Sequence, residues 1–297
     1  MSVHDAELRD PMNETVRAVG HGEPATATQG LSHDEREAFR RTYAEQGYFV
    51  FRSVVDGNQL AGLSRRLAEE FDRAKRSGAL FAGGGQISGH LNCFPGTESR
   101  FAYDAIERRG IVDLVRETLA SPRAALRVGC NFNLPNSVTQ HYHVDSPFLE
   151  GFMIVNVAVV DTDLVNGAID VLPGTQREFY PYWQFEVRRL ARLTTRLPLK
   201  RGDVLVRSSN LWHRGMPNRS TVPRPMLAFT FGERGTDTSV DPFRGDEGKI
   251  AFHPNWYRPT FAGRLRERTF VAAPITYAAY RFVRSIYGKK GYGTLDR

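Results

Sequence analysis

The most informative segment of the chain is Gln140-His141-Tyr142-His143-Val144-Asp145-Ser146-Pro147-Phe148. A further histidine, His213, follows seventy residues after His143. In an extended strand, successive side chains point to opposite faces, so His143 and Asp145 should lie on the same side. Two imidazole nitrogens and one carboxylate, with the remaining coordination positions open, are typical of non-haem iron(II) sites. We therefore predict a mononuclear metal site formed by His143, Asp145 and His213.

Other interpretations of these residues compete with this one. His141 lies on the same predicted strand face as His143 and is a rival ligand. A pair formed by His141 and His143 would resemble a cupin-type site and would leave Asp145 without a partner, so we favour His143 with Asp145. His213, beside Trp212, could also be a hydrogen-bonded structural residue.

The composition indicates a globular protein in a reducing compartment. The chain has 297 residues, of which 41% are hydrophobic and 11% aromatic, which suffices for a packed core. We expect residues 1–30 to be a flexible leader without a secretory signal, and no apolar run is long enough to span a bilayer. Two cysteines provide no disulfide framework, so we expect a cytoplasmic protein with no membrane partner.

The charge balance gives no support for nucleic-acid binding. The formal net charge is +7, but the arginines are scattered along the chain. No basic stripe is interleaved with stacking aromatic residues, as a nucleic-acid module would require. The oligomeric state does not follow from these features.

Mostly helices are predicted before residue 120, and short strands from about residue 126 to residue 231. Ser32 and Glu35 have the spacing of a capping box, which starts a helix that Gly47 ends. A strand at 48–51, a helix at about 58–75 and a helix at 103–119 should follow. Turn residues then separate short β-rich runs at 126–134, 138–144, 153–160, 168–172, 196–199, 203–207 and 225–231.

Many short strands at this spacing favour a mainly β fold with flanking helices, in which the strands form a jelly roll (a double-stranded β-helix, as in cupins). We predict one domain over 31–297, with the jelly-roll core at about 125–235. A C-terminal extension at about 240–297 should be mostly irregular, with one helix near 276–287.

Several ordered segments resemble one enzyme family. They are the Gln46–Phe51 entry strand, the His143/Asp145 pair, the Asn166–Gln176 turn, Gly202-Asp203-Val204 and the block from His213 through Asn218 and Ser220 to Arg224. Their order and spacing resemble the phytanoyl-CoA dioxygenase family of Fe(II)/2-oxoglutarate oxygenases. Gln176 departs from the family pattern, which has His there, and we regard this position as structural. The resemblance covers roughly residues 32–232 and does not reach the extension.

The resemblance implies iron(II), with 2-oxoglutarate and O2 as cosubstrates, and it places an arginine eleven residues after the last ligand, where Arg224 stands. A planar guanidinium matches a carboxylate bidentately, and lysine would not substitute well. Fe²⁺, one Asp and a dianionic cosubstrate sum to a net charge of about −1, so a cation is reasonable there. Arg224 could otherwise be a surface residue between Pro223 and Pro225.

Several polar side chains could contact the cosubstrate or the substrate. A buried amide needs hydrogen-bond partners, and the family often places a cosubstrate contact on the strand that carries Asn156. Asn131 and Asn133 should share one strand face, and Gln140 precedes the first ligand. Each of these four could equally be a satisfied core or turn amide. His90 and Asn92, after the glycines at 83–85, could line the mouth of the site.

We predict that the protein is a dioxygenase that hydroxylates an unactivated C–H bond of a small molecule, with release of succinate and CO2. The substrate could be a biosynthetic intermediate, either anionic or carrier-linked. Halogenases of this kind have Ala or Gly at the carboxylate position, so Asp145 favours hydroxylation, while desaturation, ring closure and epimerisation stay open. The alternatives are a cupin-like metal enzyme without a cosubstrate and a catalytically silent binding protein.

Overall fold

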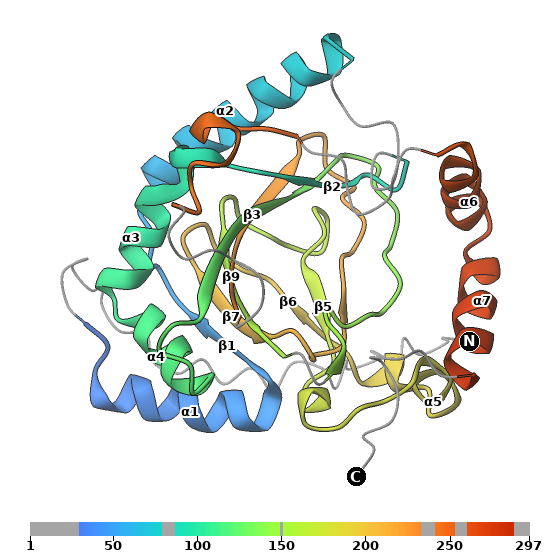
Figure 1. Ribbon diagram of the computed structural model, residues 1–297, viewed down its shortest axis with the longest axis horizontal. Coiled ribbons are helices and arrows are strands. Elements are labelled where there is room, and N and C mark those ends of the chain that lie inside the picture. The colour runs from blue at the N-terminus through green and yellow to red at the C-terminus, as the bar shows by residue number, and fades with distance from the viewer. Residues whose placement is uncertain (1–29, 79–86, 149–150, 233–240, 253–259, 288–297) are drawn as a thin grey trace, which may run out of the picture.

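The computed structural model describes residues 30–78, 87–148, 151–232, 241–252 and 260–287. The predicted leader at 1–30 and the glycines at 83–85 therefore lie outside the described residues, apart from Gly30. Two antiparallel sheets occupy the centre (Figure 1), and the larger one is open rather than closed into a barrel. This arrangement confirms the predicted jelly-roll type of fold with flanking helices.

The larger sheet has the strand order β1-β7-β4-β9-β3-β2, and all of its pairs are antiparallel. Its strands are β1 (Tyr48–Phe51), β2 (His90–Cys93), β3 (Ala125–Asn133), β4 (Met153–Ala158), β7 (Val204–Ser208) and β9 (Arg224–Gly232). The smaller sheet has the order β6-β5-β8, formed by β5 (Ile169–Val171), β6 (Thr195–Leu197) and β8 (His213–Arg214).

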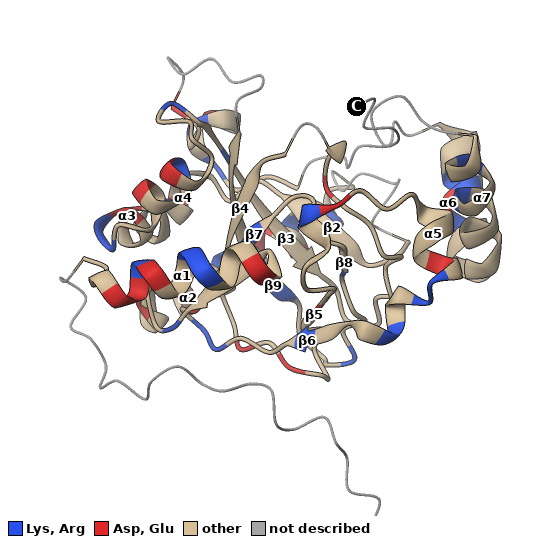
Figure 2. Cartoon of the chain, turned by 90° about the horizontal axis from the view of Figure 1, so that it is seen from below, with Lys and Arg blue, Asp and Glu red and all other residues tan. Residues whose placement is uncertain are grey.

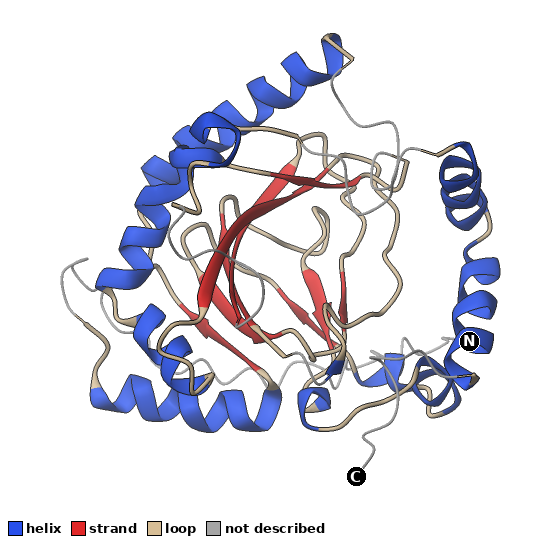
Figure 3. Ribbon diagram, viewed as in Figure 1, coloured by secondary structure: helices blue, strands red, loops and turns tan. Residues whose placement is uncertain are grey.

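Helices cover one face of the larger sheet (Figure 3). In β4, Val155 and Val157 point to these helices, and Leu227 and Phe229 of β9 join them in one core. The helices carry their charged residues on the outer surface (Figure 2). They are α1 (His33–Gln46), α2 (Gly57–Arg76), α3 (Arg100–Arg108) and α4 (Ile111–Thr118).

The alternate residues of the same strands face the inside of the fold. Because side chains alternate along a strand, Asn156 of β4, Arg207 of β7 and Arg224 of β9 point away from the helix-covered core. These three are buried polar residues in otherwise apolar strands. The alternation of side chains therefore places these three polar residues on the inner face of the sheet.

Most predicted elements agree with the structure within one or two residues. The capping box is present, with the Ser32 hydroxyl accepting from the Glu35 amide and Glu35 accepting from the Ser32 amide. The predicted helix at 103–119 is wrong as a single helix, because Gly110 adopts φ 81° and separates α3 from α4. The short strands β2 and β8 and the helix α5 (Tyr182–Val187) were not predicted.

The C-terminal extension is more helical than predicted. Two helices, α6 (Phe261–Ala272) and α7 (Pro274–Ile286), follow each other and pack together at the edge of the molecule opposite α1–α4 (Figure 1). Only the second was expected. No described helix has the length and apolar composition needed to cross a membrane.

The turn before β7 provides a test of stability. Gly202 has φ 90°, its carbonyl accepts from the amides of Val54 and Val55, and a Cβ there would lie 2.3 Å from the Val55 carbonyl oxygen. Since a non-glycine residue at positive φ alone costs about 1–3 kcal/mol, Gly202→Ala should lower the free energy of unfolding by about 2 kcal/mol or more. Urea denaturation measures this change.

The matched control is Gly62→Ala, inside α2, where the nearest atom to a new Cβ is an Arg66 nitrogen at 3.6 Å. Alanine has the higher helix propensity, so this variant should gain up to about 1 kcal/mol. Equal stability of the two variants would contradict the strained-turn interpretation.

Candidate metal centre

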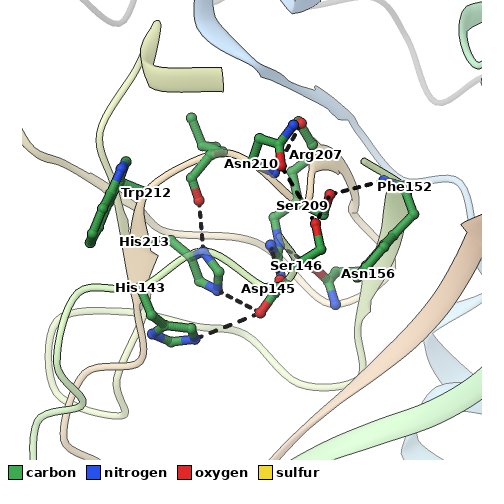
Figure 4. Close-up of polar contacts among 12 residues, drawn as sticks. His143, Asp145, Ser146, Phe152, Asn156, Arg207, Ser209, Asn210, Trp212 and His213 are labelled. Atoms are coloured by element: carbon green, nitrogen blue, oxygen red, sulfur yellow. Dashed lines mark hydrogen bonds and ion pairs between the residues drawn. The ribbon is translucent and has the colours of Figure 1, made fainter. Parts of the chain in front are cut away.

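Two histidines are held side by side by a backbone bridge. The His143 amide donates to the His213 carbonyl at 2.9 Å, and the His213 amide donates back to the His143 carbonyl at 3.0 Å. The ring centroids are 4.4 Å apart. The Asp145 amide donates to the Ser209 carbonyl at 2.9 Å, which fixes the turn that follows His143. The carboxylate thereby lies in front of both rings (Figure 4).

The predicted strand at 138–144 is wrong as a regular strand, although the segment does pair with a neighbour. Its hydrogen bonds go in turn to Ser88, Gly215 and His213, so the ladder is irregular and only His143 forms a bridge. The alternation argument for His143 and Asp145 therefore does not hold as stated. The bridge and the Ser209 contact bring the two side chains together instead.

The geometry assembles three ligand atoms that could hold a metal ion. Asp145 Oδ1 lies 3.6 Å from His143 Nε2 and 3.5 Å from His213 Nε2. One ligand atom from each residue lies within 4.8 Å of the others, and no second such group of three occurs in the part of the chain that the structure describes. His141 is not a member of this group, and its ring lies 4.5 Å from the Tyr277 ring of α7, centroid to centroid.

The hydrogen bonds of the two rings leave the correct nitrogens available. His143 Nδ1 lies 2.8 Å from the His141 carbonyl oxygen, and His213 Nδ1 lies 2.9 Å from that of Leu211. An Nδ1–H that donates to a carbonyl leaves the Nε2 lone pair available for a metal. Burial lowers the pKa of both imidazoles, that of His213 to about 3. Both rings are therefore neutral at physiological pH, which is the form that binds metal.

A buried arginine holds the other oxygen of the carboxylate. Burial alone would raise the pKa of Asp145, but the charge and hydrogen bond of Arg207 contribute to lowering it overall. Arg207 Nη1 donates to Asp145 Oδ2 at 2.6 Å and its Nε donates to Asn156 Oδ1 at 3.1 Å. Because Oδ2 is engaged, Oδ1 is the oxygen that faces the histidines. This set of two neutral imidazoles and one ionised carboxylate fits an iron(II) ion.

Arg207 is the residue that the sequence interpretation missed. An arginine at the end of the apolar run Val204-Leu205-Val206 was a signal comparable to Asn156 in β4. The role of Asn156 as a cosubstrate contact stays a prediction, and its side chain already has two protein partners. Its Nδ2 donates to the Leu227 carbonyl at 3.1 Å while its Oδ1 accepts from Arg207. Asn156 therefore holds Arg207 in place.

A variant of Arg207 tests this positioning role. Arg207→Leu removes the guanidinium and frees Asp145 Oδ2. Loss of a hydrogen-bond partner of a metal ligand typically lowers metal affinity about 10- to 100-fold. Titration with iron(II), followed by the visible absorption of the chelate with 2-oxoglutarate, measures the change. Arg207→Lys should recover only part of the affinity, since lysine cannot contact Asp145 and Asn156 together. Unchanged iron affinity in Arg207→Leu would contradict the role.

The strand register places Arg224 in a row of polar residues that runs across three neighbouring strands. In β2, β3 and β9, the residues His90, Asn133 and Arg224 lie opposite one another. Arg224 is 6% exposed, and its Nε has no hydrogen-bond partner among the described residues. Burial lowers its pKa to about 10, which still leaves it charged at neutral pH. A buried cation that forms no ion pair among the described residues fits a carboxylate ligand such as one end of 2-oxoglutarate.

The other predicted site residues have protein partners. Asn133 Nδ2 donates to the Met216 carbonyl at 3.1 Å, while its buried Oδ1 has no partner among the described residues. The Gln140 Oε1 accepts from the Gly215 amide at 2.8 Å. Asn131 is exposed and donates to Asn92 Oδ1 at 2.8 Å, which places this pair at the rim of the inner face.

His90 has both Arg224 and the metal ligand His143 as neighbours. Its Nε2 is 2.6 Å from the Val138 carbonyl oxygen, and its pKa is lowered to about 4 by burial and by the charge of Arg224. Its imidazole is therefore neutral. Gln176, predicted to be structural, donates to the Ala44 carbonyl at 3.0 Å at the end of α1.

Comparison with known proteins agrees with this site. Residues 43–226 match the family described as phytanoyl-CoA dioxygenase (PhyH). Among solved structures, AviO1 from Streptomyces viridochromogenes Tue57 has a TM-score of 0.52 at 15% identity, over 70% of this chain and 99% of its own. EvdO2 from Micromonospora carbonacea var. aurantiaca, complexed with 2-oxoglutarate, gives 0.50 at 13%, over 72% and 96%.

The epimerase SnoN from nogalamycin biosynthesis, described as non-haem and α-ketoglutarate-dependent, gives a TM-score of 0.50 at 19% identity, over 77% of this chain and 100% of its own. At such identities these structures show the common fold alone. The family match spans both histidines, Asp145 and Arg224. The chain therefore belongs to the phytanoyl-CoA dioxygenase family of non-haem Fe(II)/2-oxoglutarate-dependent oxygenases.

Proposed function

We propose that this enzyme hydroxylates an unactivated C–H bond of a small molecule. In the balanced reaction, one oxygen atom of O2 enters the C–H bond and the other enters succinate, while the C1 carboxylate of 2-oxoglutarate leaves as CO2. The observation that carries the proposal is the carboxylate of Asp145, whose Oδ1 lies 3.5–3.6 Å from both histidine Nε2 atoms. Because Asp145 is present as a ligand, the coordination position that a halide would occupy in a halogenase is not left open by the protein.

We assign the roles of the residues as follows. His143, Asp145 and His213 would hold iron(II), which when bound supplies the oxidising chemistry together with O2 and 2-oxoglutarate. Arg207 keeps Asp145 turned so that only Oδ1 faces the histidines. Arg224 would bind the distal carboxylate of 2-oxoglutarate, and its burial excludes the water that would otherwise weaken that ion pair.

For the substrate we propose an anionic or carrier-linked biosynthetic intermediate. Exposed arginines at positions 188, 189 and 192 follow α5, which packs on α7. In α7, Arg281 Nη1 donates to the Tyr142 carbonyl at 2.5 Å, so this helix lies next to the segment with the metal ligands. Basic groups on this surface would attract an anion toward the protein.

The test measures cosubstrate turnover, which requires no knowledge of the substrate. The purified protein with iron(II), 2-oxoglutarate and O2 should form succinate, and labelled O2 should place one labelled oxygen in it. The cupin-like alternative predicts no succinate, and a silent binding protein predicts that iron and 2-oxoglutarate do not bind. Full turnover in a His213→Ala variant would exclude the three-residue site.

Once a substrate is found, the mass of its product separates hydroxylation from the related outcomes. Hydroxylation adds one oxygen atom, desaturation and ring closure remove two hydrogens, and epimerisation leaves the mass unchanged. Epimerisation is the second candidate, because one protein with this fold, SnoN, is described as an epimerase.

A further inference from the structure

Helix α7 has a polar, well-packed inner side and an apolar outer side. On the inner side, Arg281 binds the Tyr142 carbonyl, Ser285 Oγ accepts from the Trp183 amide at 2.9 Å, and Tyr277 packs on His141. The outer side should be polar in a helix that faces water. Instead the exposed residues of α7 are mostly apolar, with Arg284 as the one exposed charged residue. The others include Ile275 (75% exposed), Thr276, Ala279, Tyr280 (43%), Val283 (51%), Ile286 (55%) and Tyr287 (83%).

The preceding helix α6 extends this outer surface. Phe261 and Leu265, one turn apart on the same face, are 77% and 56% exposed. Exposed arginines flank them at positions 264, 266 and 268. The two helices pack together, and Figure 2 shows basic segments on α6 at this end of the molecule.

The charges of this hairpin have one sign on its exposed side. Helix α7 contains no Asp or Glu, and the one acid of α6, Glu267, is only partly exposed. Arg284 lies at the edge of the apolar surface of α7. An apolar stripe flanked by arginines is the pattern of helices that lie in the interface of a lipid bilayer. The long arginine stems can lie along the apolar surface while their charged ends reach phosphates.

We propose that the outer side of α6 and α7 is a docking surface for an anionic phospholipid membrane. The apolar side chains would enter the head-group region, and Arg264, Arg268 and Arg284 would contact lipid phosphates. A second copy of the chain is a poorer occupant, because a two-fold contact brings the same surface of each copy together. It would place the arginines of both copies near one another without carboxylates.

This inference does not rest on the reaction proposed above. It also differs from the prediction of no membrane partner, which depended on the lack of a bilayer-spanning segment. A helix that lies on a membrane needs no such segment. Because α7 contacts His141 and Tyr142, membrane docking would place the bilayer beside the segment that carries the metal ligands.

The experiment is co-sedimentation of the full-length protein with phosphatidylglycerol vesicles and with phosphatidylcholine vesicles. Sedimentation with the anionic vesicles only, weakened by salt, is the expected result. The variant Arg264→Gln/Arg268→Gln/Arg284→Gln should lower the partition coefficient about a hundredfold, since each basic residue contributes about fivefold. The variant Ile275→Ser/Val283→Ser/Ile286→Ser should lower it by about tenfold or more.

A matched control removes the same amount of exposed apolar surface elsewhere. Leu164, Val165 and Val222 are 68%, 55% and 60% exposed in loops of the jelly roll. The triple variant with Ser at these positions should bind like the unmodified protein. Equal loss in this control, equal binding to both kinds of vesicle, or no binding overturns the proposal. So does a dimer in light scattering that the Ile275→Ser/Val283→Ser/Ile286→Ser variant abolishes, which would assign the surface to a second copy.

Discussion

Replacing Asp145 by Ala is expected to lower 2-oxoglutarate turnover by more than about a hundredfold. Loss of a residue that only hydrogen-bonds to a metal ligand already lowers metal affinity or activity about 10- to 100-fold. Asp145 Oδ1 lies within 3.6 Å of both histidine nitrogens, so its removal leaves two neutral ligands for a divalent ion. Two measurements check this: the iron(II) affinity and the rate of succinate formation.

The same substitution has a second consequence that must be separated from the first. Arg207, whose side chain is 7% exposed, loses its carboxylate partner and remains as a buried cation. We therefore expect a lower melting temperature in Asp145→Ala. The double variant Asp145→Ala/Arg207→Leu removes the unpaired cation, so its melting temperature should recover while turnover stays lost. Turnover that recovers together with the melting temperature would show that Asp145 acts through stability alone.

The elements that follow from local patterns could be predicted from the sequence. The Ser32 capping box, the helix α2 and the short strands β4 and β9 depend on neighbours within one helix turn or strand. The order of His143, Asp145, His213 and Arg224 is also a property of the chain. These features are enough to indicate the fold and the type of metal site.

The pairing of Arg207 with Asn156 could not be predicted in this way. The two residues lie on neighbouring strands whose register places Asn156 opposite Leu205 and Arg207 opposite Ile154. Their contact is therefore diagonal and depends on a register that no local pattern fixes. Each residue looked like an isolated polar position in an apolar strand.

Helix α6 was not predicted, and the reason differs from that for the contact of Arg207 with Asn156. The periodicity used to find helices assumes an apolar side that is buried and a polar side that is exposed. In α6, Phe261 and Leu265 are exposed and Gly263 interrupts the sequence, so the usual pattern is absent. The exposed apolar side chains that obscure the helical pattern of α6 are also part of the proposed membrane-docking surface.

Arg224→Ala should raise the concentration of 2-oxoglutarate needed for half-maximal turnover by about a hundredfold or more, as expected for the loss of a buried charge-assisted contact. The turnover rate at saturation should change much less, because the metal ligands are untouched. Arg224→Lys should restore only part of the affinity, since a point charge cannot form the bidentate contact. A 2-oxoglutarate titration of succinate formation measures all three proteins.

The stability of the ligand-free protein gives an independent measurement for Arg224→Ala. The expected outcome differs from the loss of stability expected for Asp145→Ala. Without its ligand, Arg224 is a buried cation whose Nε has no partner among the described residues. Its removal should therefore leave the ligand-free protein as stable as before or more so. With iron(II) present, 2-oxoglutarate should raise the melting temperature of the unmodified protein and fail to raise that of Arg224→Ala at the same concentration. If 2-oxoglutarate stabilises both proteins equally, Arg224 does not bind the cosubstrate. If it stabilises neither protein, the cupin-like alternative without a cosubstrate is favoured.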